Sequence, residues 1–241
     1  MTRTAVITGG GTGIGREIAS AFARDGLDVV ITGRRADVLK DTATELGVRA
    51  VAFDASDPDS IAVALPQLPE RVDVLVNNAG ANAVRDQPDP APGDLAAIRA
   101  MYLANLETNL LTAVLVTEAL LSRLADGARV INLGSIAGSR GAGSYGASKA
   151  ALAAWSIDIA RRIGGRGGTA NLVAPGMILE TEFFGDVLTD ERRKGQIAQT
   201  FTGRVGDPGD VAAVVRFLAS PESRHVTGQV VHVSGGAFLG R

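Results

Sequence analysis

Cysteine is absent from this 241-residue chain, and histidine occurs only twice. The missing thiols exclude a disulfide framework, thiolate zinc ligands and a cysteine nucleophile, and so few histidines argue against a histidine-rich metal centre. The formal charge of −2 gives no net attraction to nucleic acid or to an anionic membrane. The longest apolar stretch, near residues 110–121, is interrupted by glutamate and threonine and is too short to cross a bilayer. We therefore expect a soluble, cytoplasmic protein with no metal and with neither membrane nor nucleic acid as a partner.

Short apolar runs alternate with segments of helical period along the whole chain. Most runs are continuous, as in strands buried on both faces of a parallel sheet. The predicted strands are Thr4–Thr8, Asp28–Thr32, Arg49–Phe53, Val72–Asn77, Ala128–Leu133, Thr169–Ala174 and Gln229–Val233. The predicted helices are Ile14–Asp25, Ala36–Leu46, Ser60–Leu65, Leu95–Leu124 (as one helix or two), Ser144–Ile163 and Asp207–Leu218. This order predicts an α/β fold: one domain over residues 1–241 with a Rossmann-like, doubly wound, seven-stranded parallel sheet and helices on both faces.

Glycine is abundant, with 30 residues, and one cluster follows the first predicted strand. The cluster runs from Gly9 to Gly15 in the pattern T-G-x-x-x-G-x-G and leads directly into a helix. A strand, a glycine turn and a helix place backbone N–H groups and the positive end of a helix against a pyrophosphate. A tight turn without a ligand would have the same composition. The position at the start of a βαβ unit favours nucleotide binding.

The residues after the second predicted strand indicate which dinucleotide is bound. An NAD site places a carboxylate there, whereas this chain has Gly33 followed by Arg34 and Arg35. A guanidinium binds a 2′-phosphate through two hydrogen bonds, and a carboxylate would repel it. The alternative is that the two arginines only begin a solvated helix. We expect NADP(H) to be preferred over NAD(H), with Arg34 facing the phosphate.

Tyr145 and Lys149 stand four residues apart at the start of a predicted helix. This spacing places both side chains on one face of the helix, and in a chain with two tyrosines and three lysines it is improbable by chance. An ammonium group beside a phenol favours the phenolate and lowers the pKa of the tyrosine toward neutrality. Ser135 follows the fifth predicted strand, at the sheet edge where ligands bind in this fold, and could orient a substrate oxygen toward Tyr145. A lone serine after a strand is otherwise a helix cap or a turn former.

Together these motifs resemble the short-chain dehydrogenase/reductase family over essentially the whole chain. The segments that carry the resemblance are TGGGTGIG at 8–15, FDASD at 53–57, NNAG at 77–80, TNLLT at 108–112, GSIAG at 134–138, YGASK at 145–149, APG at 174–176 and TGQVVHVSGG at 227–236.

The resemblance implies a catalytic tetrad of Asn109, Ser135, Tyr145 and Lys149. Tyr145 would protonate the carbonyl oxygen as hydride arrives, and Ser135 would hold that oxygen. Lys149 would bind the nicotinamide ribose, and Asn109 would position a water that links Lys149 to solvent. The cofactor-binding residues implied by the glycine turn and the resemblance are Gly9, Thr12, Gly13, Ile14, Arg34, Asp54, Ala55, Asn78, Gly80, Tyr145, Lys149, Pro175, Gly176, Ile178 and Thr181. Thr12 stands where many NADP-preferring relatives carry a second basic residue.

Two C-terminal segments, TGRVGDPGDVAAVVRFLAS at 202–220 and VTGQVVHVSGG at 226–236, most resemble the branch that reduces 3-oxoacyl thioesters. The resemblance implies a small carbonyl compound as the substrate, including one linked as a thioester. Asp126 lies before the fifth strand, where a base that contacts a carrier protein is expected, so Arg161, Arg162 or Arg166 would have to supply that base. A segment at about 181–205 stands where the family has a substrate lid. The alternatives are a dehydrogenase of a sugar, polyol or other secondary alcohol, and a non-catalytic dinucleotide-binding regulator.

Members of the family usually pair the helices that correspond to Leu103–Leu124 and Ser144–Ile163 of this chain. The second of these helices carries small residues, Ala150, Ala151 and Ala154, that permit close approach of another helix. We therefore expect a homotetramer, with a homodimer as the alternative.

Overall fold

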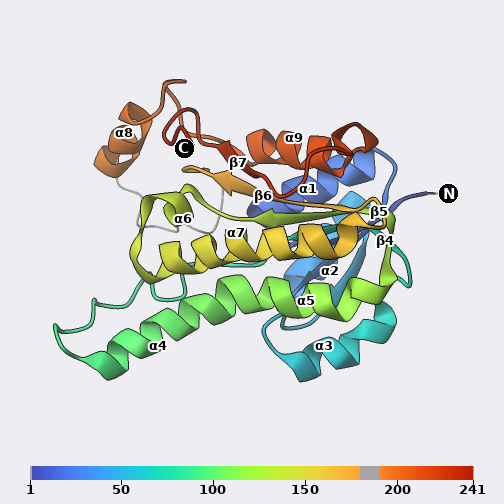
Figure 1. Ribbon diagram of the computed structural model, residues 1–241, viewed down its shortest axis with the longest axis horizontal. Coiled ribbons are helices and arrows are strands. Elements are labelled where there is room, and N and C mark those ends of the chain that lie inside the picture. The colour runs from blue at the N-terminus through green and yellow to red at the C-terminus, as the bar shows by residue number, and fades with distance from the viewer. Residues whose placement is uncertain (1, 180–189, 241) are drawn as a thin grey trace.

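A computed structural model describes residues 2–179 and 190–240 and shows a seven-stranded sheet in which every neighbouring pair of strands is parallel (Figure 1). The strand order is β3-β2-β1-β4-β5-β6-β7. The strands are β1 (Thr4–Thr8), β2 (Asp28–Gly33), β3 (Arg49–Ala52), β4 (Val72–Asn77), β5 (Leu124–Leu133), β6 (Thr169–Pro175) and β7 (Val230–Val233). The predicted doubly wound parallel sheet is confirmed.

Helices cover both faces of this sheet (Figure 1). The α-helices are α1 (Gly13–Arg24), α2 (Ala36–Leu46), α3 (Pro58–Ala64), α4 (Leu95–Leu106), α5 (Thr112–Leu120), α6 (Ile136–Arg140), α7 (Gly143–Gly164), α8 (Asp190–Ala198) and α9 (Pro208–Ala219). Short 3-10 turns follow α3, α5 and α9 at Leu65–Gln67, Leu121–Arg123 and Pro221–Ser223. Among the described residues, no helix is long and apolar enough to cross a membrane.

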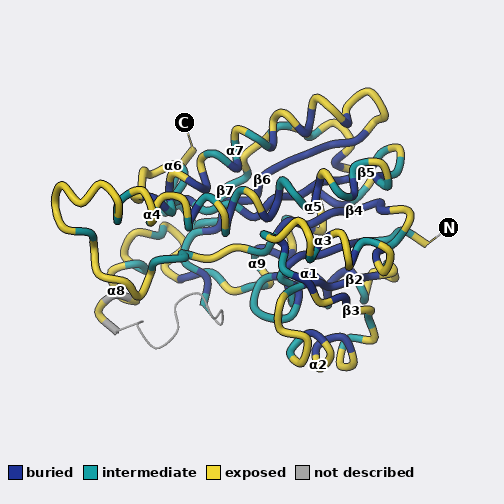
Figure 2. The backbone as a smooth tube through the Cα atoms, turned by 90° about the horizontal axis from the view of Figure 1, so that it is seen from below, coloured by how far each residue is buried: buried dark blue, intermediate teal, exposed yellow. Residues whose placement is uncertain are grey.

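Alternate residues of each central strand enter two separate hydrophobic cores. In β1, Ile7 packs with α1, α2 and α9, whereas Val6 packs with α3, α5 and α7. Both side chains are completely buried, and in Figure 2 the central strands form a buried band between exposed outer turns. This double burial explains why the strands read as continuous apolar runs.

The structure corrects three predictions of secondary structure. The helix predicted as Leu95–Leu124 ends earlier, because Leu124 already belongs to β5 and pairs with Val72. The register with β4 then shifts before Arg129 pairs with Val74, so β5 begins four residues before the predicted Ala128. Two helices, α6 and α8, were not predicted, because α6 has only five residues and α8 has no apolar face.

The chain reverses its direction of winding between β1 and β4, and both strands end at the same edge of the sheet. A crevice at this reversal point is where open α/β sheets bind their ligands. Below it, buried amides link β4 and β5 to α7: Asn77 donates to Asn132 Oδ1 (2.8 Å), and Asn132 donates to Ser156 Oγ (2.8 Å). The fold therefore fixes β4, β5 and α7 relative to one another beneath the crevice.

Candidate active site

A cavity of about 860 Å³ opens at the carboxyl ends of the central strands. It brings together residues from seven of the eight segments that carry the family resemblance; none from 227–236 lines it. The predicted site residues that line it are Gly9, Thr12, Gly13, Ile14, Arg34, Asp54, Ala55, Asn78, Gly80, Ser135, Tyr145, Lys149, Pro175, Gly176 and Ile178. Asn109 lies behind this wall, and Thr181 lies outside the described residues.

The glycine turn presents a helix start without a cap to this cavity. Gly9 and Gly13 have φ angles of 65° and 53°, a left-handed conformation that favours glycine. Thr12, the N-cap of α1, makes no side-chain hydrogen bond to the helix, and the first turn carries no acidic residue. By contrast, aspartate side chains cap α3 and α9. The free N–H groups and positive end of α1 therefore suit a diphosphate.

Gly15 has a different role from the phosphate approach that its place in the motif suggested. A Cβ at Gly15 would collide with the carbonyl oxygen of Gly9 and lie 2.5 Å from Asn78 Nδ2. Asn78 uses that nitrogen to bond the carbonyl oxygens of Thr8 and Gly9, both at 3.0 Å. Asn78 thus ties the end of β4 to the glycine turn, in addition to lining the cavity.

One part of the cavity carries two exposed cations, Arg34 and Arg35, and one anchored anion. Arg34 is exposed at the end of β2 and lines the cavity. Asp54 Oδ1 accepts hydrogen bonds from the backbone N–H (2.9 Å) and the hydroxyl (2.7 Å) of Ser56. These bonds, with a smaller contribution from the charge of Arg34, lower the pKa of Asp54. Arg34 and Asp54 are close enough to influence one another, as two contacts to one adenosine moiety require.

Lys149 is buried in the wall of the cavity, with 5% of its surface exposed. Its Nζ donates to the carbonyl oxygen of Leu133 (2.9 Å), and no carboxylate pairs with it among the described residues. Burial disfavours the charged form and lowers the pKa of Lys149 to about 8.

Ser135 and Tyr145 bring two hydroxyl groups together in the wall of the cavity. Ser135 caps α6, accepting from the N–H of Ala137 (3.1 Å), and its side chain is hydrogen-bonded to Tyr145. Burial raises the pKa of Tyr145 to about 12, while the bond to Ser135 acts in the opposite direction. The expectation that Lys149 lowers this pKa is not met: Nζ lies 5.9 Å from the tyrosine ring centroid, and burial has the largest effect on the pKa of the phenol.

Asn109 lies in a π-turn, Glu107–Leu111, which joins α4 to α5. Its Nδ2 donates to the carbonyl oxygens of Ala81 (2.8 Å) and Asn105 (3.0 Å), while its buried Oδ1 has no hydrogen-bond partner among the described residues. A Cβ at Gly80 would lie 2.7 Å from this oxygen and 3.1 Å from Lys149 Nζ. The absent side chain of Gly80 therefore leaves space in which a small polar group can bridge Asn109 and Lys149.

The basic side chains at the cavity are not those expected from the sequence. Arg161 and Arg162 lie in the last turn of α7, which places them about 24 Å along the helix from Tyr145, and Arg166 follows that helix. Arg85 and Arg140 line the cavity instead. Arg140 bonds Gln199 Oε1 (3.1 Å) and the carbonyl oxygen of Ala237, joining α6 to the C-terminal turn. Arginine is common in this chain, so the sequence did not distinguish these two.

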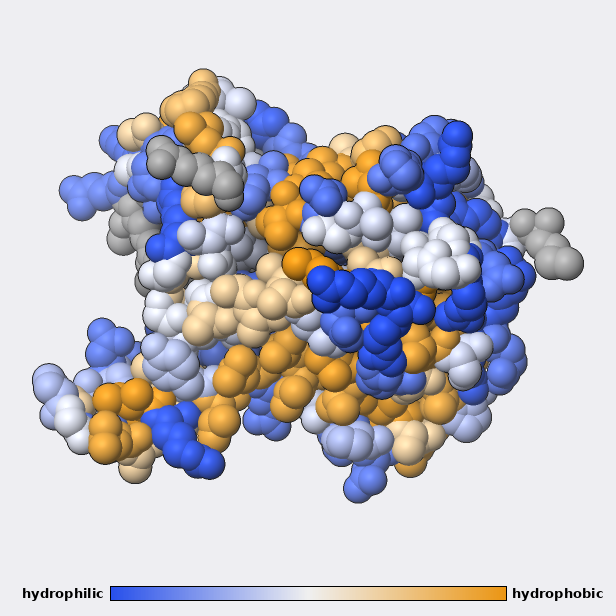
Figure 3. All heavy atoms as spheres, in the orientation of Figure 1, coloured by the Kyte–Doolittle hydropathy of each residue, from blue (hydrophilic) through white to orange (hydrophobic). Residues whose placement is uncertain are grey.

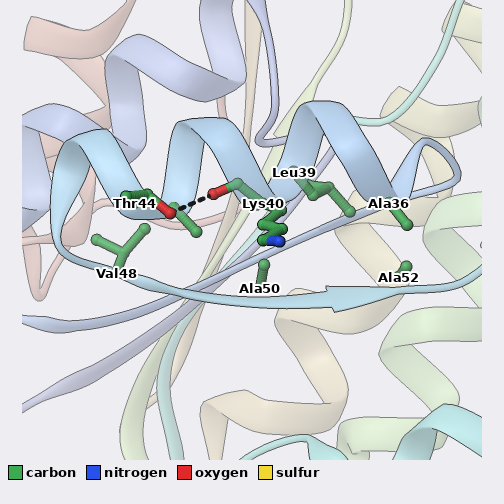
Figure 4. A pocket seen from close by; sticks show the side chains of 8 residues that line it. Ala36, Leu39, Lys40, Thr44, Val48, Ala50 and Ala52 are labelled. Carbon is green, nitrogen blue, oxygen red and sulfur yellow. Dashed lines mark hydrogen bonds between the residues drawn. The ribbon is translucent and has the colours of Figure 1, made fainter.

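A second pocket, of about 360 Å³, lies between α2 and the edge strand β3 (Figure 4). Its lining is mainly alanine, leucine and valine, with Lys40 as its single titratable side chain. The hydroxyl of Thr44 points to the helix and donates to the carbonyl oxygen of Lys40 (2.8 Å). This pocket contains no arrangement of nucleophile, acid and base, so the larger cavity is the candidate active site.

The comparisons with known proteins agree with this site. A family model described as enoyl-(acyl carrier protein) reductase matches residues 9–237. The 3-oxoacyl-[acyl-carrier-protein] reductase FabG of Vibrio cholerae is 35% identical, and the match covers 98% of each chain. The chain belongs to the short-chain dehydrogenase/reductase family, and it is an NAD(P)-dependent oxidoreductase that acts on CH–OH and C=O groups.

Two solved structures are similar in both sequence and fold. A blue fluorescent protein from a metagenomic library, in complex with NADPH, has a TM-score of 0.86 and 32% identity over 98% of each chain. A short-chain dehydrogenase/reductase from Brucella melitensis, described as glucose/ribitol dehydrogenase, has a TM-score of 0.88 and 30% identity. That match covers 99% of this chain and 97% of the other.

The described residues fit a nicotinamide dinucleotide. The uncapped start of α1 suits its diphosphate, and behind the cavity wall Asn109 Oδ1, without a hydrogen-bond partner among the described residues, lies near Gly80 as Lys149 Nζ does. When bound, the dinucleotide supplies or accepts the hydride of the reaction.

The burial of Lys149 predicts an unusual dependence of stability on pH. Its folded-state pKa, about 8, is below the unfolded value of 10.5, so the unfolded chain binds more protons between these values and stability rises with pH there. The free energy of unfolding, relative to Lys149→Met, should increase by about 2 kcal/mol from pH 7.5 to pH 9.5. Denaturant titrations of both proteins at the two pH values measure this. An equal slope for both proteins would show that Lys149 is not buried as a cation.

Proposed function

We propose that the protein is an NADP(H)-dependent reductase of 3-oxoacyl thioesters. The observation that carries this proposal is the hydrogen-bonded Ser135–Tyr145 pair beside the buried Lys149 in one wall of the cavity. Two neighbouring hydroxyl groups can both form hydrogen bonds to the same carbonyl oxygen of a substrate. Ser135 orients that oxygen and Tyr145 transfers its hydroxyl proton to it, while a bound dinucleotide would supply the hydride to the carbonyl carbon. Lys149 would hold the ribose of that dinucleotide. Asn109 holds a water between Lys149 and solvent, from which the proton is replaced.

The protonation state of Tyr145 matches the acid role that carbonyl reduction requires. With a pKa of about 12, the phenol keeps its proton at neutral pH and is therefore an acid rather than a base. Carbonyl reduction needs this acid, whereas alcohol oxidation needs the phenolate. The acyl-thioester substrate is supported by the similarity to the Vibrio cholerae reductase over 98% of both chains.

A second candidate function is the oxidation of a sugar, polyol or other secondary alcohol. The Brucella melitensis protein described as glucose/ribitol dehydrogenase supports it at 30% identity. The segment expected to be a lid includes α8, whose Gln196 lines the cavity. The amide of this side chain could bind a hydroxyl-rich substrate as well as a thioester.

A panel of 3-oxoacyl thioesters, simple ketones, sugars and polyols, assayed with NADPH and NADH, tests the proposal. The thioesters should give the highest kcat/KM, and Tyr145→Phe should lower kcat by about 10²–10⁴ because it removes the transferable proton. Binding of NADPH, measured by fluorescence, should remain unchanged in this variant. Polyol oxidation faster than thioester reduction would favour the second candidate, and full turnover by Tyr145→Phe would refute the mechanism.

The preference for NADP(H) depends on Arg34. Replacing one charge-assisted bidentate contact costs about 1.5–3 kcal/mol, so Arg34→Ala should raise the KM for NADPH by about 10–100-fold with little effect on NADH. Arg24→Ala, which removes an exposed arginine of α1 outside the cavity, is the matched control. An unchanged ratio of kcat/KM values for the two cofactors would assign the preference to another residue.

We also propose that the protein is a homotetramer. Exposed apolar side chains lie on two separate faces: Leu103, Leu111 and Ile157 on the face formed by α4, α5 and α7, and Phe217 and Val230 on α9 and β7. Figure 3 shows the first face, where apolar atoms extend over α4 and α5. Two self-complementary faces on one chain give a tetramer with three twofold axes, whereas one face gives a dimer.

A charge on the first face should separate the tetramer. Leu103→Glu would place a carboxylate in the contact between two chains that pack through their α4–α7 faces. Light scattering at micromolar concentration should then show a dimer in place of the wild-type tetramer. Val63→Glu is the control, because Val63 is 76% exposed on α3, outside both faces. A wild-type protein that is already a monomer would overturn the proposal.

A further inference from the structure

The first turn of α7, which carries Tyr145, has no cap of its own. The N-cap residue, Ala142, makes no side-chain hydrogen bond to the helix, and Gly143 adopts a φ of 58°. Gly141, two residues earlier, also has a positive φ, of 76°. Backbone bonds from Gly141 and Ala142 to the carbonyl oxygen of Ala137 tie this turn to α6, but no side-chain cap fixes it, so side-chain contacts from other elements contribute to the placement of Tyr145.

Asn105 of α4 provides such a contact. Its side chain is completely buried, and its Nδ2 donates to the hydroxyl of Ser144 (2.9 Å), the residue immediately before Tyr145. Its Oδ1 accepts from the backbone N–H of Ala83 (3.1 Å), in the loop that continues from Gly80. One amide thus connects the helix of Tyr145 with a loop that borders the cavity.

The main chain of Asn105 takes part in the same network. Its carbonyl oxygen accepts from Asn109 Nδ2 (3.0 Å), and Asn109 also bonds the carbonyl oxygen of Ala81 (2.8 Å). Asn105 and Asn109 are four residues apart, on one face of the helix. Together they clamp residues 81–83 against α4, while only Asn105 extends the clamp to α7.

A separate anchor holds the remainder of α7. Ser156 accepts from Asn132 Nδ2 of β5 (2.8 Å), three turns after Tyr145. Tyr145 and Lys149 both lie between the Asn105–Ser144 contact and this second anchor. Loss of the first contact should therefore loosen the turn of Tyr145, including its bond to Ser135, and leave the packing of α7 on the sheet intact.

We propose that Asn105 is a positioning residue for the reaction, which holds Tyr145 opposite Ser135 through its hydrogen bond to Ser144. The proposal rests on the function proposed for Tyr145. Asn105 itself does not line the cavity and need not touch substrate or cofactor.

A double-mutant cycle of Asn105→Ala and Ser144→Ala tests the proposal. A displacement of about 1 Å of a reacting group costs about 10²-fold in rate, so each single variant should lose about 10–100-fold in kcat, with the KM and the NADPH affinity little changed. The double variant should be no slower than the slower single variant, because both substitutions remove the same bond. If Asn105→Ala fails to fold, Ser144→Ala carries the test alone, since it keeps the contact to Ala83.

The pH profile separates positioning from general weakening. In alcohol oxidation, the apparent pKa of kcat should move to higher pH in both single variants, because the Ser135 bond that favours the phenolate is loosened. Asn171→Ala is the matched control: it removes an equally buried amide that bonds Val226 and Gln229, so it should lower stability without changing kcat or the profile.

Two results would overturn the proposal: additive losses in the double variant, or a kcat and pH profile like those of Asn171→Ala. Tyr145→Phe in the same assay keeps the two hypotheses apart. If Tyr145→Phe is inactive while Ser144→Ala is fully active, only the role of Asn105 fails. If Tyr145→Phe is active, the proposed mechanism itself fails.

Discussion

The site depends on a buried ammonium group whose hydrogen-bond partner among the described residues is a backbone carbonyl. Lys149 reaches into the wall of the cavity and donates to the carbonyl oxygen of Leu133 at the end of β5. Burying a cation without a carboxylate is costly, so the surrounding structure must hold it there. The strands and α7 provide that rigidity through the amide ladder from Asn77 to Ser156. The missing side chain of Gly80 provides the space beside Nζ.

The sheet was predictable because burial on both faces requires each strand to have a mainly apolar sequence. A strand buried on both faces is mostly apolar, and β1 and β4 were therefore predicted with their observed ends, although β4 also buries Asp73 and Asn77. The elements that were not predicted lack such a sequence pattern. The π-turn at Glu107–Leu111 has the same apolar content as an ordinary helix, and α8 is stabilised by no apolar stripe of its own. Leu124 continued the helical spacing, but pairing with Val72 placed it in β5.

The site was predictable where a residue type is required by chemistry and not where tertiary contacts decide its role. Tyr145 with Lys149 stood out by spacing, and the structure places both in the cavity. The pKa of Tyr145 could not be inferred from that spacing, because it depends mainly on the burial of the phenol, which raises it. The role of Asn105 was not predicted either. A polar residue in a helix gives no sign of its tertiary partners, and those of Asn105 are the Ser144 hydroxyl and the Ala83 N–H.

The helices that hold the site are also those with exposed apolar faces. On α4, the completely buried Asn105 faces Ser144, while Leu103, 44% exposed, faces outward, and Ile157 of α7 is 41% exposed. A second chain packed on this face would bury Leu103 and Ile157 and restrict movement of α4 against α7. That movement is the one that would separate Asn105 from Ser144. Assembly through this face would therefore stabilise the same contact that positions Tyr145, so that loss of the interface should lower kcat before it unfolds the chain.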